Sequence, residues 1–128
     1  MADARFVPRA FTTEPELFGD RAEIGWRALP VDLQERVAFL AAQTQHDFAV
    51  KLRARMKEIW WTPATYARWA GMKPERLRRL LRGEIVAQTI DYVMAWELVG
   101  VRLRIHLLPL QSDQEAHLRA MGGAAKRR

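Results

Sequence analysis

Apolar residues recur at helical spacing along most of the chain, which predicts a mainly α-helical protein. From Pro30 onward, Leu33, Val37 and Leu40 repeat at i, i+4 and i+7. The polar AQTQHD stretch weakens this pattern, and we expect it to end or bend the helix, with Asp47 capping a fresh start. A second apolar stripe follows, made by Phe48, Leu52, Met56 and Ile59.

Two short amphipathic helices are predicted in residues 62–83, the stretch TPATYARWAGMKPERLRRLLRG. Thr62 can accept hydrogen bonds from the first-turn amides, and a proline suits the first helical position that follows it. Gly71 supplies the positive φ that a tight turn requires. The second helix begins at Pro74, with Lys73 as a weak cap.

A wheel of 100° per residue gives the second helix two unlike faces. The leucines converge on one side and are predicted as core: Leu77, Leu80 and Leu81. Charged side chains occupy the rest: Glu75, Arg79 and Arg82 lie opposite the leucines, and Arg76 and Arg78 flank them. Ala67 is expected where the two helices meet, because only a small side chain leaves room there for Leu77.

A further helix is predicted in TIDYVMAWELVG, with a core of Tyr92, Val93, Trp96 and Val99 and a stop at Gly100. The next residues, VRLRIHL, alternate apolar with basic, which predicts a strand over residues 101–110. A lone strand leaves backbone groups unpaired, so it needs a partner. The partner is either the N-terminal region or the same strand of a second copy; we favour the second, which gives a symmetric dimer.

The predicted organisation has four parts in 128 residues. Residues 1–28 form a flexible arm, in which Trp26 is a docking anchor; residues 29–100 form a helical domain; residues 101–110 form the strand and a possible dimerisation element. Residues 111–128 form a mobile basic tail, whose final KRR either touches DNA backbone or is merely solvated. The expected fold is all-α in the main, with one C-terminal β-strand.

The charge distribution favours a polyanionic partner. The formal net charge is +6 and the sequence pI is about 10.5. Residues 1–50 hold five Arg/Lys against eight Asp/Glu, residues 51–82 hold ten against two, and residues 83–128 hold six against five. The positive charge therefore belongs to the two short helices and the helix before them.

Other classes of function lack their required residues. There is no cysteine, which excludes disulfides and thiolate chemistry. No apolar run approaches the ~20 residues that span a bilayer, and the start lacks the apolar segment of a signal peptide. We therefore expect a cytoplasmic protein without a membrane partner. The three histidines share no ligand spacing, so no metal or other cofactor is expected. No set of nucleophile, base and oxyanion donors is apparent, so we expect no enzyme.

Ala67, Gly71 and Leu77 stand at the spacing of a helix-turn-helix. The stretch TPATYARWAGMKPERLRRLLRGE, with a helix before it and TIDYVMAWELVGV after it, resembles the phage-repressor/Cro-like (XRE) family of DNA-binding domains over about residues 46–101. Ala67, Gly71, Leu77 and Leu80 fill the structural positions of the motif. Lys73 departs from the usual small hydroxyl cap.

The resemblance implies a lambda-repressor-like bundle, here with an extra N-terminal helix, whose second motif helix lies in the DNA major groove. Base readers would be Glu75, Arg76 and Arg79. Phosphate contacts would be Thr62, Lys73, Arg78, Arg82, Gln88 and Thr89. Pro63 stands where the family often has a DNA-contacting glutamine, so that contact is lost. The implied function is a sequence-specific regulator of double-stranded DNA, acting as a homodimeric repressor of the mobile-element immunity or autoregulator type.

Interpretations without specific DNA recognition stay open. Arginine-rich helices are usually solvated surfaces. The tryptophans could stack on unpaired bases, although the helical positions of Trp60, Trp61, Trp69 and Trp96 favour core. Two rival functions remain: an antitoxin-like module that binds a protein partner through its acidic N-terminal region, and an architectural DNA binder without sequence preference.

Overall fold

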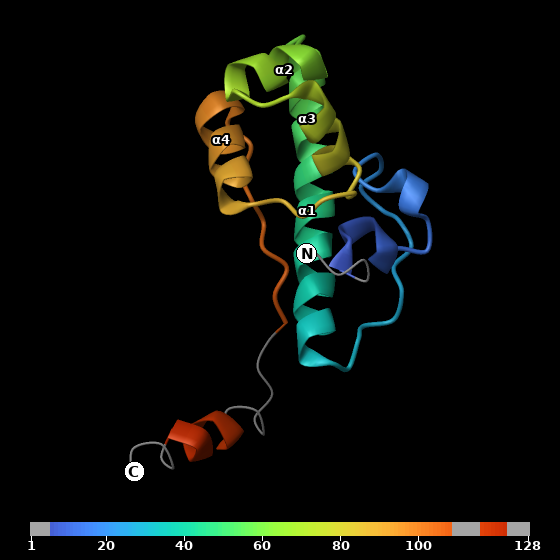
Figure 1. The fold of residues 1–128 in the computed structure, drawn as a ribbon, viewed down its shortest axis with the longest axis vertical. Helices are drawn as coiled ribbons and strands as arrows, with labels where there is room; N and C mark the ends of the chain where they lie inside the picture. The colour runs from blue at the N-terminus through green and yellow to red at the C-terminus, as the bar shows by residue number, and fades with distance from the viewer. Residues whose placement is uncertain (1–5, 109–115, 123–128) are drawn as a thin grey trace.

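The computed structural model describes residues 6–108 and 116–122, and it is mainly helical (Figure 1). Its elements, in chain order, are the 3-10 helices η2 (Pro8–Phe11) and η3 (Pro15–Leu17) and the helices α1 (Leu33–Glu58), α2 (Pro63–Ala70), α3 (Pro74–Leu81) and α4 (Thr89–Val99). In Figure 1 the long α1 runs through the middle of the molecule, with α2 and α3 near its C-terminal end and the N-terminal segment along its side. Of the predicted regions, residues 1–5, 109–115 and 123–128, with the KRR end, lie outside the described residues.

Helix α1 is continuous, so the predicted break at AQTQHD is wrong. Asp32 caps the helix by accepting a hydrogen bond of 3.1 Å from the Glu35 N–H, whereas Asp47 lies inside the helix and caps nothing. The predicted apolar positions Leu33 and Val37 are exposed. The polar stretch stays helical because its side chains reach groups from other parts of the chain, as the contacts of Thr44, Gln45 and His46 show below.

Residues 6–28, predicted as a flexible arm, pack on the first half of α1. Phe11 meets Phe39 edge-on at 5.8 Å between ring centroids, and Trp26 meets the same ring at 5.8 Å. Thr12 and Trp26 form an isolated antiparallel bridge that folds this segment back on itself. The segment thereby completes a second small core. No helical periodicity in the sequence predicts this core.

His46 ties this segment to α1. Its Nδ1 accepts a hydrogen bond of 2.8 Å from the Gly19 N–H, and its Nε2 lies 3.3 Å from the Ala22 carbonyl oxygen, to which it can donate. Burial lowers the pKa of His46 below its ordinary value, and the backbone carbonyls and Asp47 only partly oppose this. The folded protein therefore favours the neutral ring, whose unprotonated Nδ1 is the acceptor that Gly19 needs.

We expect the free energy of unfolding to fall in mild acid because of His46. The unfolded pKa is about 6.5 and the folded pKa is lower, so the stabilisation is complete above about pH 6.5 and is lost as the pH falls, by up to about 1.4 kcal/mol per pH unit. Urea denaturation between neutral pH and about pH 5 measures this. His46→Gln, which keeps an acceptor but does not titrate, should flatten the profile, whereas His117→Gln should leave it unchanged. Identical profiles for all three proteins would contradict this role.

The main core lies between the second half of α1 and helices α2, α3 and α4. Its buried residues are Phe48, Ala49, Leu52, Met56, Tyr66, Ala67, Leu77, Leu80, Leu81, Ala95, Val99 and Val101. The predicted core face of α4 is wrong in part: Val99 is buried as predicted, but Val93 and Trp96 are exposed, and Asp91 and Ala95 are buried instead. Tyr92 is half-buried, with its ring 4.8 Å from that of Phe48.

The predicted strand over residues 101–110 is wrong for residues 101–108, the part of that range that the structure describes. No strand forms there. This segment has no regular secondary structure and runs beside α1 in Figure 1. Val101 is buried, but Leu103, Ile105 and Leu107 are exposed. A strand requires a neighbour to pair with, and the described residues supply none.

Residues 116–122, part of the predicted tail, are helical with exposed side chains. Across the described ranges 6–108 and 116–122, no helix combines the length and apolar content that a membrane span requires.

Candidate nucleic-acid interface

Helices α2 and α3 are joined by the tight turn that the sequence predicts. The Thr62 hydroxyl accepts from the Thr65 N–H at 3.1 Å and caps α2. Gly71 has φ 69°, and the Met72 N–H donates to the Ala67 carbonyl at 2.9 Å, which closes the helix end. Ala67 is fully buried, as a residue at the helix crossing must be.

Helix α3 is anchored by its three leucines. Leu77, Leu80 and Leu81 are buried, which confirms the predicted core face. The side chains of Glu75, Arg79 and Arg82 are exposed on the rest of the helix. Because the apolar side is fixed against α1 and α2, the orientation of the charged side is fixed too.

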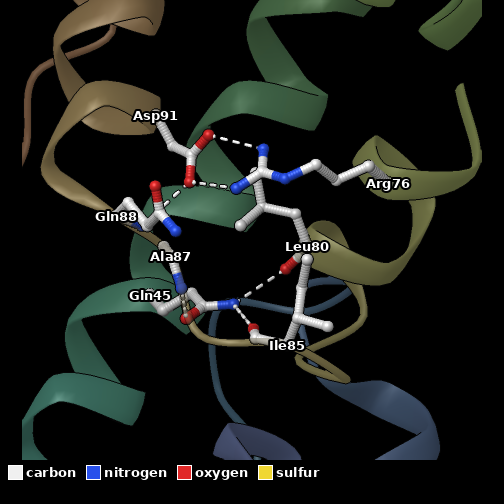
Figure 2. Close-up of polar contacts among 7 residues, drawn as sticks. All are labelled: Gln45, Arg76, Leu80, Ile85, Ala87, Gln88 and Asp91. Atoms are coloured by element: carbon white, nitrogen blue, oxygen red, sulfur yellow. Dashed lines mark hydrogen bonds and ion pairs between the residues drawn. The ribbon is translucent and has the colours of Figure 1, made fainter. Parts of the chain in front are cut away.

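Arg76 does not join that exposed set. Its guanidinium makes a two-pronged ion pair with Asp91 of α4, with Nη1 at 2.7 Å from Oδ1 and Nη2 at 2.9 Å from Oδ2 (Figure 2). These hydrogen bonds raise the pKa of Arg76, and the Asp91 side chain is only 3% exposed. This arrangement argues against Arg76 as a base reader, because a buried carboxylate requires a partner and Arg76 is that partner.

Glu75 and Arg78 pair with each other on the exposed surface. The Arg78 Nη2 lies 2.6 Å from the Glu75 Oε1, and this bond lowers the pKa of the Glu75 carboxyl. Glu84 lies 3.4 Å from Arg78 and 3.5 Å from Arg82. An exposed pair of this kind contributes little to stability because water screens it, so these side chains can exchange partners readily.

Arg79 is the arginine of α3 that the described residues leave without an acidic partner. Lys73 is exposed at the N-terminus of α3, where its side chain caps nothing. Arg53 of α1 is half-buried near Asp20 and Arg82, and burial lowers the pKa of Arg53, so it is not one of the exposed cations. The exposed cations on and beside α3 thus outnumber its two acidic neighbours, Glu75 and Glu84.

The remaining predicted phosphate contacts, Gln88 and Thr89, lie at the start of α4. The Gln88 backbone N–H donates to the Asp91 Oδ2 at 2.8 Å, so Asp91 holds this helix start and Arg76 together. Thr89 is the first residue of α4 and is exposed. The helix start is therefore positioned relative to α3 by one buried carboxylate.

Gln45, which the sequence pattern does not single out as functional, fixes the loop between α3 and α4. Its Nε2 donates to the carbonyl oxygens of Leu80 and Ile85, both at 2.9 Å, and its Oε1 accepts from the Ala87 N–H at 2.8 Å (Figure 2). A polar residue at a core position of a helix is the only sign of such a role in the sequence.

The N-terminal segment supports the end of α3. The Arg9 N–H donates to the Gly83 carbonyl at 3.0 Å. Gly83 has φ 70°, and a Cβ there would lie 2.6 Å from the Phe18 ring. The close approach requires glycine at this position, and the aromatic ring of the N-terminal segment closes the core below α3.

Three tryptophans predicted as core are exposed. Trp60, at the junction of α1 and α2, is 93% exposed and has φ 62°. Trp69 of α2 is 64% exposed and Trp96 of α4 is 48% exposed. Trp61 is half-buried, with its ring 6.5 Å from that of Tyr66. The buried faces of α2 and α4 are set by Tyr66, Ala67, Ala95 and Val99, and Trp69 and Trp96 lie on other sides of these helices.

No family model matches this chain, and no curated protein or solved structure is significantly similar to it. The resemblance to phage-repressor/Cro-like domains therefore rests on residues 46–101 alone. A function for the chain has to be inferred from its own side chains and their geometry.

Proposed function

We propose that this protein is a sequence-specific, double-stranded DNA-binding transcriptional regulator of the repressor type, built on a helix-turn-helix and acting as a homodimer. In this proposal α2 and α3 are the two helices of the motif and α3 enters the major groove. The observation that carries the proposal is the division of α3 into a buried leucine side and an exposed charged side.

Rigidity of the reading helix supports this proposal. Base recognition requires side chains held in a fixed orientation on a firm support. Helix α3 has that support on each side: the leucines below it, Arg76 bonded to Asp91 of α4, and Gln45 bonded to the Leu80 carbonyl. A merely solvated surface helix would not need these buried polar bonds.

The exposed side of α3 offers suitable chemistry. Arg79 can donate two hydrogen bonds to a guanine, and Glu75 can accept from a cytosine amino group. Phosphate contacts fall to Arg78, Arg82, Lys73 and the N-terminus of α2 at Thr62. Since the pair of Glu75 and Arg78 is exposed, DNA can replace it at little cost.

The acidic N-terminal region has a structural role in this proposal. Phe11 and Phe18 are buried, and the segment is bonded to α1 through His46 and to the end of α3 through Gly83. We therefore do not propose residues 6–28 as a partner-binding arm.

Selection of bound DNA from a random pool tests the proposal. We expect a consensus of two half-sites, a steep loss of affinity with rising salt, and a preference of about a thousandfold or more over random DNA. The same salt dependence without a consensus would support the architectural binder. Failure to retain any duplex would reject both.

Arg79→Ala should relax the base preference at one position of each half-site. The lost two-pronged bond costs about 1–3 kcal/mol of discrimination there, with little change in stability because Arg79 is exposed. Binding to a panel of single-base variants of the consensus measures this. Arg68→Ala, which removes an exposed arginine from α2, is the matched control and should keep the preference. Equal effects of the two changes would remove Arg79 from the reading set.

A further inference from the structure

An apolar groove of about 700 Å³ lies beside α4, and no residue of α3 lines it. Its walls include Thr44 of α1, Tyr92, Val93 and Trp96 of α4, and Leu103 and Ile105 of the following segment. Apolar residues occupy every side of α4, and a helix of this composition normally has its whole surface covered. Yet Val93 is 52% exposed, and nothing within the described part of the chain covers this exposed half of its surface.

The segment along this groove has unpaired backbone groups. The His106 N–H donates to the Thr44 hydroxyl at 2.9 Å. Apart from that bond, the backbone of residues 102–107 makes no hydrogen bond to any described part of the chain. In a strand, alternate residues direct their N–H and C=O groups to opposite edges. With His106 directed at α1, the edge formed by Leu103, Ile105 and Leu107 is open.

We propose that a second copy of the chain covers this groove, with residues 101–108 of the two copies paired as antiparallel strands about a twofold axis. The pairing would satisfy the open edge, and the apolar side chains of each copy would cover α4 of the other. The interface deepens the proposed function, on which its purpose rests, because a twofold dimer presents two copies of α3 to a repeated site.

Charge restricts the register of the pairing, and the axis at Ile105 is the one we propose. Residues directly opposite share a face, and like charges opposite each other are destabilising. If the twofold axis passes beside Leu103, Arg102 of one copy lies opposite Arg104 of the other. If it passes beside Arg104, the Arg104 residues of the two copies lie opposite each other. An axis at Ile105 avoids both arrangements: Ile105 faces its own copy, Leu103 faces Leu107, and Arg104 faces His106.

The same register supplies a countercharge for Arg104. The His106 Nε2 lies 3.6 Å from the Asp47 Oδ2, which also lies 3.4 Å from the Lys51 Nζ. An arginine that meets His106 therefore also approaches this carboxylate and would share it with Lys51. Arg104 is exposed and has no acidic partner within the described residues. The segment is therefore complementary to a second copy of itself in hydrogen bonding and charge.

The mass of the full-length protein in solution, measured without DNA by analytical ultracentrifugation at micromolar concentration, tests the interface. We expect twice the chain mass of 14.8 kDa. Ile105→Lys, at a residue that is 60% exposed, should give the single-chain mass with an unchanged thermal melt. Val31→Lys makes the same kind of change at another exposed apolar residue and should leave the dimer intact. A wild-type protein of single-chain mass, or an Ile105→Lys protein that stays dimeric, would overturn the proposal.

Disulfide trapping tests the register, because the natural chain has no cysteine. Opposite Cα atoms in a hydrogen-bonded antiparallel pair are about 5.5 Å apart, within the range that a disulfide spans. Oxidised Ile105→Cys should therefore give covalent dimers, with much less from Arg104→Cys and only background from Val31→Cys. More cross-linking at position 104 than at 105 would overturn the register.

These measurements are separable from the test of DNA binding. A dimer that ignores duplex DNA would reject the proposed function and keep the interface. A single-chain protein that reads one half-site would reject the interface and keep the function.

Discussion

Gln45→Leu is expected to lower the free energy of unfolding by about 3 kcal/mol, because it leaves two half-buried backbone groups without a partner. The substitution removes the acceptor of the Ala87 N–H and the donor to the Ile85 carbonyl. The Leu80 carbonyl loses one bond too, but it keeps the Gly83 N–H at 3.3 Å. Leucine has nearly the volume of glutamine, so lost hydrogen bonding rather than a cavity sets the cost. Urea denaturation measures the loss.

The site of the damage is also predictable. The loop between α3 and α4 should loosen first, so the Ala87 amide should lose protection from hydrogen exchange by more than the global change in stability explains. Gln43→Leu is the matched control: Gln43 lies on the same helix, is half-buried and has no side-chain bond within the described residues. We expect it to stay within about 0.5 kcal/mol of the wild type. Equal losses in the two variants would show that the bridge made by Gln45 contributes no stability.

Local chemistry made α2 and α3 predictable from sequence. The Thr62 cap, the positive φ of Gly71 and the buried leucines of α3 depend on neighbours within a few residues. Helical period and end signals record such features directly. The buried side of α3 could be predicted because three leucines stand among charged residues, and only one side of the helix can therefore be apolar.

The polar stretch in α1 could not be interpreted in the same way. Gln45 bonds to residues 35–42 positions away, and His46 bonds to Gly19, 27 positions away. Hydrophobic periodicity predicts that such polar residues interrupt the helix, because their hydrogen-bond partners are distant in the sequence. The same limit applies to VRLRIHL, whose alternation indicates a capacity for strand pairing but not the partner. For α4, which is apolar all round, the period cannot choose the buried side.

Arg76→Met is expected to lower the free energy of unfolding by about 3 kcal/mol, because it leaves the Asp91 carboxylate buried with the Gln88 N–H as its one remaining partner among the described residues. Methionine keeps much of the apolar stem, so the lost guanidinium dominates the effect. Replacing both partners, as Arg76→Met with Asp91→Leu, should recover much of the loss, since an apolar pair leaves no buried charge. Thermal and urea denaturation of the single and double variants measure the coupling between the two side chains.

Arg79→Met is the control that separates the two kinds of arginine on α3. It lies one helical turn from Arg76 and is exposed without an acidic partner in the described residues, so its stability should stay within about 0.5 kcal/mol of the wild type. Its cost should appear instead as lost base preference in DNA binding. If Arg76→Met proves no more destabilising than Arg79→Met, the ion pair with Asp91 does not hold α3 in place, and Arg76 returns to the set of base-reading candidates. A large loss for Arg76 alone would mean that one arginine fixes the angle of α3 against α4 and the other is free to meet DNA.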